Sequence, residues 1–396
     1  MVLSEVLVKG AGVAARRRLT ILGSTGSVGC NTLAIIADNP EAYKVVALTA
    51  YRNVELLARQ ARATNAEIAV IGDDSLLGDL RALLSDTEIE VASGENAVEE
   101  AASRPVEWVM AGIVGAAGLR PTLAAVRQGA VIALANKECL VCAGDIMLQE
   151  VAKHGAVLLP ADSEHNAIFQ VFDFDSPETV ARIILTASGG PFLKSSLERM
   201  ARATPAEAVA HPNWDMGAKI SVDSATMMNK GLEIIEAHRL FPVAPDQIDV
   251  LVHPQSVIHS LVAYRDGSTL AQLGPPDMRT PISYTLGWPE RIETKAAQLD
   301  LASIGNLTFQ EPDPVRFPAL RLAREALETG GSLPTVLNAA NEIAVAAFLD
   351  ERIGFLRISE IVEETMQRVA GGKIDSLEAI TTFDGEARRL ALEILE

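Results

Sequence analysis

A glycine-rich turn lies between an apolar segment and a helical pattern near the start of the chain, and it constrains the fold more than any other feature. Residues 18–24 (RLTILGS) form a compact apolar segment that predicts a strand. Gly23, Gly26 and Gly29 have the spacing G-x-x-G-x-x-G, and residues 29–40 have the periodicity of a helix. Such a turn points backbone amides at a bound anion. It predicts a dinucleotide site, with a plain tight turn as the alternative.

Strand and helix patterns alternate through the first 160 residues. Further strands are predicted at 44–50, 67–72, 107–115, 130–136 and 157–161, with helical patterns between them. This alternation predicts a parallel, doubly wound sheet covered by helices on both faces. We therefore expect an α/β protein whose residues 1–159 form a Rossmann-like, dinucleotide-binding domain.

The pattern changes after residue 160. Longer strand patterns and an Asp-Gly hairpin turn predict a mixed or antiparallel sheet, and we expect an α+β connective, catalytic domain at residues 160–288. Residues 289–316 contain three prolines and no clear periodicity, which indicates a linker. Only helical patterns follow, so residues 317–396 predict a C-terminal helical bundle domain.

Composition and charge exclude several classes of protein. The apolar content of 48% with only 4% aromatic residues is typical of an α/β protein, and the formal charge of −18 argues against nucleic acid as a partner. The apolar run at 109–119 is too short to cross a bilayer, so we expect no membrane partner. Three cysteines are too few for a disulfide framework, which predicts a cytoplasmic protein. The first 17 residues, whose basic end follows the apolar part, predict a short leader and not a secretory signal.

Two segments at strand ends refine the predicted dinucleotide site. The second strand ends in Arg52 and Asn53 where an NAD enzyme usually carries an acid, and an arginine suits the 2′-phosphate of NADP. A solvated surface arginine is the alternative. Asn136, Lys137 and Glu138 follow another predicted strand and are expected to face the cofactor crevice. The alternative there is a helix N-terminus capped by Asn136.

The stretch DSEHNAIFQ (162–170) places carboxylates where a core is expected to begin. If the segment is extended, Asp162 and Glu164 face the same side and can share a hard cation. Glu233, in GLEIIEAHRL, is the candidate for a third oxygen ligand. A ligand set of oxygens alone favours Mg²⁺ or Mn²⁺ over zinc. A salt-bridged surface turn is the alternative.

Three later segments offer groups that bind a phosphate. They are TASGGPF (186–192), HPNWDMGAKIS (211–221) and SVDSATMMNKG (221–231), and the second is a Pro/Gly-bounded loop that is able to close over a ligand. The groups that they supply are Ser188, His211, Trp214, Ser224, Asn229 and Lys230. Each of these residues alone favours the alternative, a capping or solvated role, and only their grouping near the carboxylates indicates a site. His253 and His259 lie in HPQSVIHS, and a hydrogen-bonded structural role is the alternative for both.

Together these motifs resemble one family, the 1-deoxy-D-xylulose 5-phosphate reductoisomerases of the non-mevalonate isoprenoid pathway. The resemblance runs from about residue 18 to the end of the chain, through LTILGSTGSVG, VGAAGL, LANKE, DSEHNAIFQ, TASGGPF, HPNWDMGAKISVDSATMMNKGLE and HPQSVIHS. It implies a homodimer that converts 1-deoxy-D-xylulose 5-phosphate to 2-C-methyl-D-erythritol 4-phosphate with NADPH and Mg²⁺ or Mn²⁺. It also implies a phosphorylated sugar as the substrate.

The resemblance implies a role for each matching residue. The implied metal ligands are Asp162, Glu164 and Glu233. The implied cofactor residues are Gly23, Thr25, Gly26, Ser27, Val28, Tyr51, Arg52, Asn53, Asn136, Glu138 and Gly217. The implied substrate and catalytic residues are Lys137, Ser163, Glu164, Ser188, His211, Trp214, Met216, Ser224, Asn229, Lys230, Glu233 and His259, with the loop of His211, Trp214 and Met216 as a flap.

One residue departs from the family pattern, and two other functions stay open. Tyr51 stands where many relatives have glycine, and a tyrosine is disfavoured at positive φ. The first alternative function is another NADPH- and metal-dependent reductase of a small phosphorylated aldehyde or ketol. The second is a non-catalytic protein that senses dinucleotides, which leaves the three carboxylates unexplained.

Overall fold

The structure is a computed structural model that describes residues 16–214 and 216–396. The chain divides into two compact units. The first contains residues up to Cys139, Met147–Asn166 and Asp277–Ala297, and the second contains Leu140–Ile146, Ala167–Pro276 and Gln298–Glu396. Of the predicted leader, residues 1–15 lie outside the described part, and Arg17 already begins a strand. No helix in the described ranges has the length and apolar character needed to cross a membrane.

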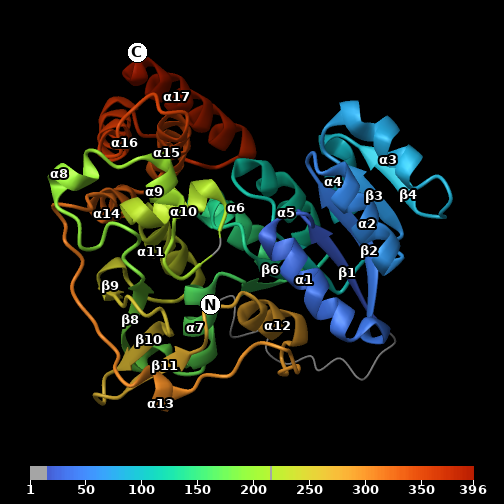
Figure 1. The fold of residues 1–396 in the computed structure, drawn as a ribbon, viewed down its shortest axis with the longest axis horizontal. Helices are drawn as coiled ribbons and strands as arrows, with labels where there is room; N and C mark the ends of the chain where they lie inside the picture. The colour runs from blue at the N-terminus through green and yellow to red at the C-terminus, as the bar shows by residue number, and fades with distance from the viewer. Residues whose placement is uncertain (1–15, 215) are drawn as a thin grey trace. The chain divides into compact units, whose positions relative to one another are not determined.

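A seven-stranded parallel sheet forms the centre of the first unit, in the order β4-β3-β2-β1-β5-β6-β7 (Figure 1). The strands are β1 (Arg17–Leu22), β2 (Tyr43–Ala50), β3 (Ile68–Ile71), β4 (Glu90–Ser93), β5 (Trp108–Ala111), β6 (Val131–Leu134) and β7 (Val157–Pro160). The strand order reverses between β1 and β5, and sheets of this kind bind ligands at such a switch point. The prediction of a doubly wound parallel sheet is confirmed.

Helices cover this sheet because its strands are apolar on both faces. They are α1 (Ser27–Asp38), α2 (Val54–Thr64), α3 (Leu77–Leu83), α4 (Glu95–Ala102), α5 (Leu119–Val126) and α12 (Arg279–Gly287). Helix α12 joins the unit from far along the sequence: Ile282 and Leu286 are buried in the sheet's core, and Trp108 Nε1 donates a hydrogen bond to the carbonyl of Thr285 (3.0 Å). Burial of these side chains explains why residues 277–297 belong to the first unit.

The second unit contains a four-stranded mixed sheet in the order β11-β10-β8-β9. The strands are β8 (Val180–Ala187), β9 (Ile248–Val252), β10 (Ile258–Tyr264) and β11 (Thr269–Leu273). The predicted Asp-Gly hairpin joins β10 and β11, and Gly267 has the positive φ (91°) that such a turn requires. The prediction of a mixed sheet is confirmed.

Helices make up the rest of the second unit, and the C-terminal group follows the prediction. The C-terminal helices are α14 (Ala319–Thr329), α15 (Leu333–Leu349), α16 (Arg357–Arg368) and α17 (Leu377–Leu395). The others are α8 (Leu197–Met200), α9 (Pro205–Val209), α10 (Ala218–Thr226), α11 (Met228–Leu240) and α13 (Leu301–Ile304). Helix α13 and a single bridge between Val252 and Gln310 are the regular structure within the predicted linker.

Helices α6 (Glu138–His154) and α7 (Ser163–Val171) each contribute residues to both units. Helix α6 is kinked at Ala143, whose φ and ψ are not helical. Helix α7 contradicts the assumption that the segment of Asp162 and Glu164 is extended. The Asp162 carbonyl accepts from the Asn166 amide (2.9 Å) and the Asp162 carboxylate accepts from the Glu164 amide (3.1 Å), so the segment is already a helix N-terminus.

Candidate active site

The glycine turn lies at the carboxyl end of β1, and its three glycines differ in backbone conformation and in the space around them. Gly23 has φ +78°, and a Cβ there would lie 2.7 Å from the carbonyl oxygen of Gly112. A Cβ on Gly29 would lie 2.5 Å from Gly23 and Ser24 backbone atoms. Gly26 is exposed at the N-cap of α1, and its substitution meets nothing closer than 3.4 Å. The turn therefore exposes a short backbone segment at a helix N-terminus, as a pyrophosphate site requires.

The end of β2 presents a cationic group beside the glycine turn's strand. Arg52 forms an ion pair with Asp73 (Nε to Oδ2, 2.9 Å), and the Arg52 side chain is 69% exposed. Hydrogen bonds from Ser75 lower the pKa of Asp73, so the carboxylate is charged. The Arg52 guanidinium also lies 5.2 Å from the ring centre of Tyr51. Asn53 caps α2 by accepting from the Leu56 amide.

Tyr51 does not adopt the backbone conformation that its replacement of glycine suggested. It is absent from the positive-φ residues of the described ranges. Its side chain is 68% exposed and is in contact with the Arg52 guanidinium. The residue is therefore accommodated without backbone strain, and it presents an aromatic face to solvent.

Asn136 behaves as the structural alternative predicted. Its amide is buried and donates to the carbonyls of Ile113 and Gly115 (2.8 Å to the latter), and its Oδ1 accepts from the Cys139 amide (3.3 Å). Asn136 thus caps α6 and holds the loop after β5. Lys137 and Glu138 follow directly, and the Lys137 ammonium lies 2.8 Å from Oδ2 of Asp162.

The carboxylate cluster of the first unit is Asp162 and Glu164 at the start of α7. Asp162 Oδ1 lies 3.3 Å from Nδ1 of the fully buried His165, and Ser163 Oγ donates to Glu164 Oε2 (2.7 Å). His165 stands inside the quoted motif but was not predicted as a site residue. Its i, i+3 spacing from Asp162 would have indicated the contact if the segment had been assigned as a helix.

In the second unit, Ser188 and His211 are brought together by the loop after β8. His211 Nδ1 accepts from the amides of Asn213 (3.2 Å) and Trp214 (3.0 Å), so the proton of the neutral ring is on Nε2. Nε2 then donates to Ser188 Oγ (2.8 Å), which also accepts from the Gly190 amide (3.2 Å). With two donors already on Ser188 Oγ, its own hydroxyl proton is left to donate to a further acceptor. Burial lowers the pKa of His211, which favours this neutral form.

Trp214 and Met216, of the predicted flap, are half-buried, and Gly217 is the exposed N-cap of α10. The Trp214 ring lies 6.1 Å from the ring of His259. His259 is buried, its Nε2 lies 3.3 Å from the Pro275 carbonyl, and burial lowers its pKa. His253 has the structural role given as the alternative, because its ring nitrogens bond backbone groups of Thr308 and Val257.

Helices α10 and α11 position the remaining polar residues. Glu233 is fully buried in α11 and accepts from Asn229 Nδ2 (2.6 Å) and from the Lys230 ammonium. Ser224 lies on α10, one turn before Met227, whose positive φ (62°) joins the two helices. The spacing of Asn229, Lys230 and Glu233 at i, i+3 and i, i+4 explains why one helix face brings them together.

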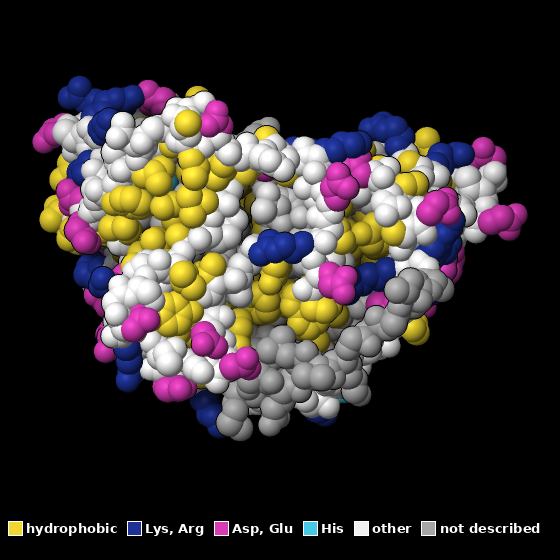
Figure 2. Space-filling model, turned by 90° about the horizontal axis from the view of Figure 1, so that it is seen from below, with side chains coloured by type: hydrophobic (Ala, Val, Ile, Leu, Met, Phe, Trp, Pro, Cys, Tyr) yellow, Lys and Arg dark blue, Asp and Glu magenta, His cyan; other side chains and the backbone are white. Residues whose placement is uncertain are grey.

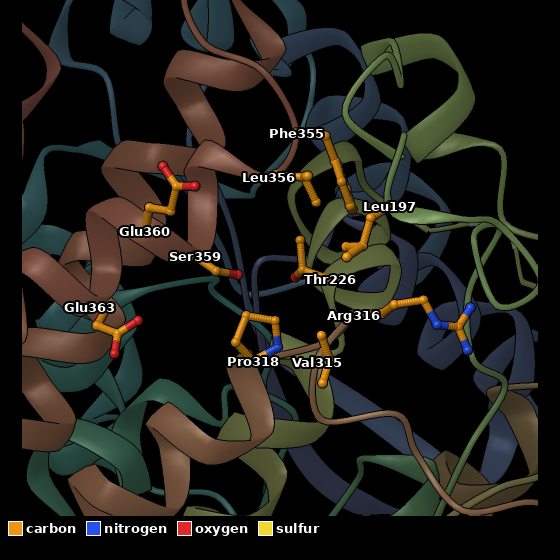
Figure 3. A pocket seen from close by; sticks show the side chains of 10 residues that line it. All are labelled: Leu197, Thr226, Val315, Arg316, Pro318, Phe355, Leu356, Ser359, Glu360 and Glu363. Carbon is orange, nitrogen blue, oxygen red and sulfur yellow. The ribbon is translucent and has the colours of Figure 1, made fainter. Parts of the chain in front are cut away.

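A cavity of about 180 Å³ in the second unit lies apart from these residues (Figure 3). Figure 3 shows the Arg316 guanidinium at one end and the carboxylates of Glu360 and Glu363 at the other. All three are engaged elsewhere: Arg316 with Asp313, and the two carboxylates with arginines on α16 and α14. None of the predicted site residues lines this cavity.

Comparison with known proteins decides the family. Residues 19–144 match the family described as 1-deoxy-D-xylulose 5-phosphate reductoisomerase, and residues 158–241 match its C-terminal domain. Residues 273–390 match the DXP reductoisomerase C-terminal domain. A 1-deoxy-D-xylulose 5-phosphate reductoisomerase of Rhodospirillum centenum is 62% identical over 379 residues, which covers 96% of this chain and 94% of the relative.

The chain belongs to the 1-deoxy-D-xylulose 5-phosphate reductoisomerase family. A second family member, from Zymomonas mobilis, is 56% identical over 96% of this chain and 98% of its own length. A solved structure of this family from Zymomonas mobilis, in complex with NADPH, has a TM-score of 0.92 at 54% identity and covers 97% of this chain and 99% of that chain. Another, of a DOX-P reductoisomerase in complex with NADPH, fosmidomycin and magnesium, has a TM-score of 0.91 at 44% identity and covers 96% and 98%.

Proposed function

We propose that this chain converts 1-deoxy-D-xylulose 5-phosphate to 2-C-methyl-D-erythritol 4-phosphate with NADPH and Mg²⁺ or Mn²⁺. The observation that carries the proposal is the match of nearly the whole chain, at 62% identity, to a relative named for this activity. Solved family members in complex with NADPH and magnesium support both cofactors. The site residues below are proposed from this relationship together with their local geometry.

Ser188, Ser224, Asn229 and Lys230 are proposed to bind the substrate phosphate. The two hydrogen bonds that Ser188 Oγ accepts from His211 and the Gly190 amide support this role, because they leave the Ser188 hydroxyl proton to donate to a further acceptor. Lys230 and Asn229 supply an ammonium and an amide at the start of α11. Ser163, Lys137 and His259 are proposed to contact the rest of the substrate, and the flap with His211, Trp214 and Met216 to exclude water when closed.

Asp162, Glu164 and Glu233 are proposed to hold the divalent ion. Three carboxylates fit Mg²⁺ or Mn²⁺, which prefer oxygen ligands, and the buried position of Glu233 favours a bound cation as a partner. The ion would supply Lewis-acid stabilisation of negative charge on the substrate oxygens. Lys137 beside Asp162, and Lys230 beside Glu233, hold these carboxylates in place.

NADPH is proposed to lie on the glycine turn, and it would supply the hydride for the reduction. The N-terminus of α1, with Gly23, Thr25, Gly26, Ser27 and Val28, offers backbone amides for the pyrophosphate. Arg52 and Asn53 are proposed to contact the 2′-phosphate, and the exposed position of Arg52 supports this. The further proposed contacts of the cofactor are Tyr51, Asn136, Glu138 and Gly217.

The function is tested by following NADPH oxidation with two substrates in parallel. We expect the absorbance of NADPH to fall with 1-deoxy-D-xylulose 5-phosphate and Mg²⁺, and not with a plain aldehyde phosphate. Turnover of the aldehyde phosphate alone would favour the alternative, another reductase of small phosphorylated carbonyl compounds. Absence of turnover with both, with NADPH binding intact, would favour a non-catalytic dinucleotide sensor.

The molecular context of the chain is also proposed. A homodimer is supported by β11, which pairs with β10 alone among the described strands and carries the 49% exposed Leu270. Hydrophobic side chains gather on the left of the face seen from below, where β10 and β11 lie (Figure 2). The cytoplasmic location, and the division at residues 159, 288 and 316 into four parts, remain proposals from the sequence. Light scattering of the purified chain tests the dimer.

A further inference from the structure

The ion pair between Lys219 and Asp223 on α10, and the buried amide of Asn341 on α15, have no part in the function proposed above. Asp223 is 1% exposed, and its two carboxylate oxygens have different partners. Oδ2 lies 2.9 Å from the ammonium of Lys219, one turn earlier on the same helix. Oδ1 accepts a hydrogen bond from Nδ2 of Asn341 (2.8 Å), which lies 118 residues away on α15 and is fully buried.

The composition of this group shows that local helix stability does not explain it. Lys219 stands in the first turn of α10, where the helix dipole disfavours a cation. A lysine that precedes its acid by four residues is also the weaker order for such a pair. Burying a carboxylate is costly, and replacement of a whole buried polar group by well-packed apolar residues is often neutral or stabilising. The group therefore serves something other than the helix itself.

The contact with Asp223 requires the hydrogen-bond donors of the Asn341 amide. A carboxylate only accepts, so the Asn341 NH₂ must face Asp223. Its carbonyl oxygen Oδ1 is then buried with no hydrogen-bond partner in the described part of the chain. Because an unsatisfied buried oxygen is unfavourable, retention of asparagine indicates that the bond to Asp223 is the feature required.

The position of α10 links this bond to the proposed phosphate site. Ser224 follows Asp223 directly, and the loop of Ser188 lies against the helix there: a Cβ on Gly190 would be 2.8 Å from the Ser224 carbonyl oxygen. The helix is thus in contact with the Ser188 loop at Ser224 and with Asn341 at Asp223. Its C-terminal end passes through Met227 into α11, which carries Asn229 and Lys230.

We propose that Asp223, fixed by Asn341, is a positioning residue that sets α10 so that Ser224 and the residues of α11 meet the substrate phosphate. This inference rests on the proposed function. It assigns to a helix of the C-terminal group, α15, a role in substrate affinity. The bond acts through helix position, so it governs KM for the substrate and leaves the reacting groups and NADPH binding unchanged.

The test compares Asn341→Ala with a matched control, Asn338→Ala, in the full chain. Asn338 is also fully buried on α15, but its amide bonds Glu342 of the same helix and not α10. We expect Asn341→Ala to raise KM for 1-deoxy-D-xylulose 5-phosphate, and the Kd for inorganic phosphate measured by calorimetry, by about tenfold to a hundredfold. We expect kcat and the Kd for NADPH to change by less than about threefold. Asn338→Ala should lower Tm without raising KM for 1-deoxy-D-xylulose 5-phosphate or the Kd for inorganic phosphate.

A reciprocal exchange keeps the test decisive if Asn341→Ala folds poorly. Asn341→Asp alone places two carboxylates together and should raise KM further, whereas Asn341→Asp combined with Asp223→Asn restores a carboxylate–amide pair and should return KM toward the original value. Equal KM effects from the Asn338 and Asn341 variants, or no rescue by the exchange, would overturn the positioning role. An unmodified chain that neither turns over nor binds phosphate would instead overturn the proposed function, and this inference with it.

Discussion

Alanine substitutions at two glycines of the turn should affect two different quantities, the free energy of unfolding in one case and the affinity for NADPH in the other. In Gly29→Ala the new Cβ would lie 2.5 Å from three backbone atoms of Gly23 and Ser24, about 1 Å inside the usual contact distance. Backbone cannot rotate away as a side chain does, so we expect the upper end of the usual overpacking cost, about 3 kcal/mol of unfolding free energy. For a folding unit of this size that lowers Tm by about 6–12 °C.

In Gly26→Ala the same methyl group meets only Gly23 O at 3.4 Å, and φ is −76°. We expect a change in unfolding free energy below about 0.5 kcal/mol. The methyl nevertheless occupies the surface on which a pyrophosphate must approach the backbone. The Kd for NADPH should therefore rise by about tenfold, which corresponds to about 1.4 kcal/mol.

Thermal unfolding and fluorescence titration with NADPH measure these two effects separately. The expected result is a crossed pattern, in which Gly29→Ala loses stability and Gly26→Ala loses cofactor affinity with its Tm preserved. An unchanged Tm for Gly29→Ala would refute the close approach of α1 to the turn. Unchanged NADPH affinity for Gly26→Ala would refute the placement of the pyrophosphate at this turn.

Three further predictions concern charged groups of the site. Glu233→Gln should lower Mn²⁺ affinity by about a hundredfold, with the Kd for NADPH within about twofold, because only the proposed ion and Lys230 lose a charged partner; calorimetry checks it, and retained Mn²⁺ affinity would exclude Glu233 as a ligand. Burial lowers the pKa of His211 below its ordinary 6.5, so the contribution of the neutral ring to stability is complete above that value and declines as pH falls through the folded pKa. The free energy of unfolding should therefore fall with pH across this range, and His211→Asn should remove that dependence. An unchanged pH dependence in the variant would contradict the prediction. Arg52→Ala should raise the Kd for NADPH by roughly tenfold and leave that for NADH unaltered, whereas equal losses for both cofactors would place Arg52 away from the 2′-phosphate.

The parallel sheet could be predicted from the sequence because its cause is local. Strands such as β2 and β5 are apolar on both faces, and short apolar runs separated by helical patterns allow few other folds. The hairpin between β10 and β11 was predicted equally well from one Asp-Gly pair. The placement of α12 in the first unit was not predicted, since its contact with Trp108 spans 177 residues and leaves no periodic signal in the sequence.

The start of α7 shows where a residue pattern misleads. Asp162 and Glu164 were expected to face one side because an extended segment was assumed. Helix α7 instead begins at Ser163, and the two carboxylates still converge, with a ligand oxygen of each within 4.8 Å of the other. The hydrogen bond from the Glu164 amide to the Asp162 carboxylate shows that Asp162 acts as a helix cap. Asp, Ser, Thr and Asn before an apolar run indicate a helix start, and that signal should have outweighed the alternation. The residues were therefore singled out on the basis of a conformation that they do not adopt.

The formal charge of −18 and a proposed phosphate substrate are compatible because acids near the site neutralise its cations. Lys219 lies against Asp223, and Lys230 lies against Glu233, each within one turn of a helix. Such pairs hold an ammonium in a fixed place, and the carboxylate's charge limits its attraction for anions in general. Affinity for a phosphate then depends on neutral donors in fixed directions, namely the Ser188 hydroxyl set by His211 and the amide of Asn229. In the proposed site, the arrangement of hydrogen-bond donors and not excess positive charge would then determine phosphate affinity. The proposed role of α10 and α11 in substrate affinity follows from this arrangement.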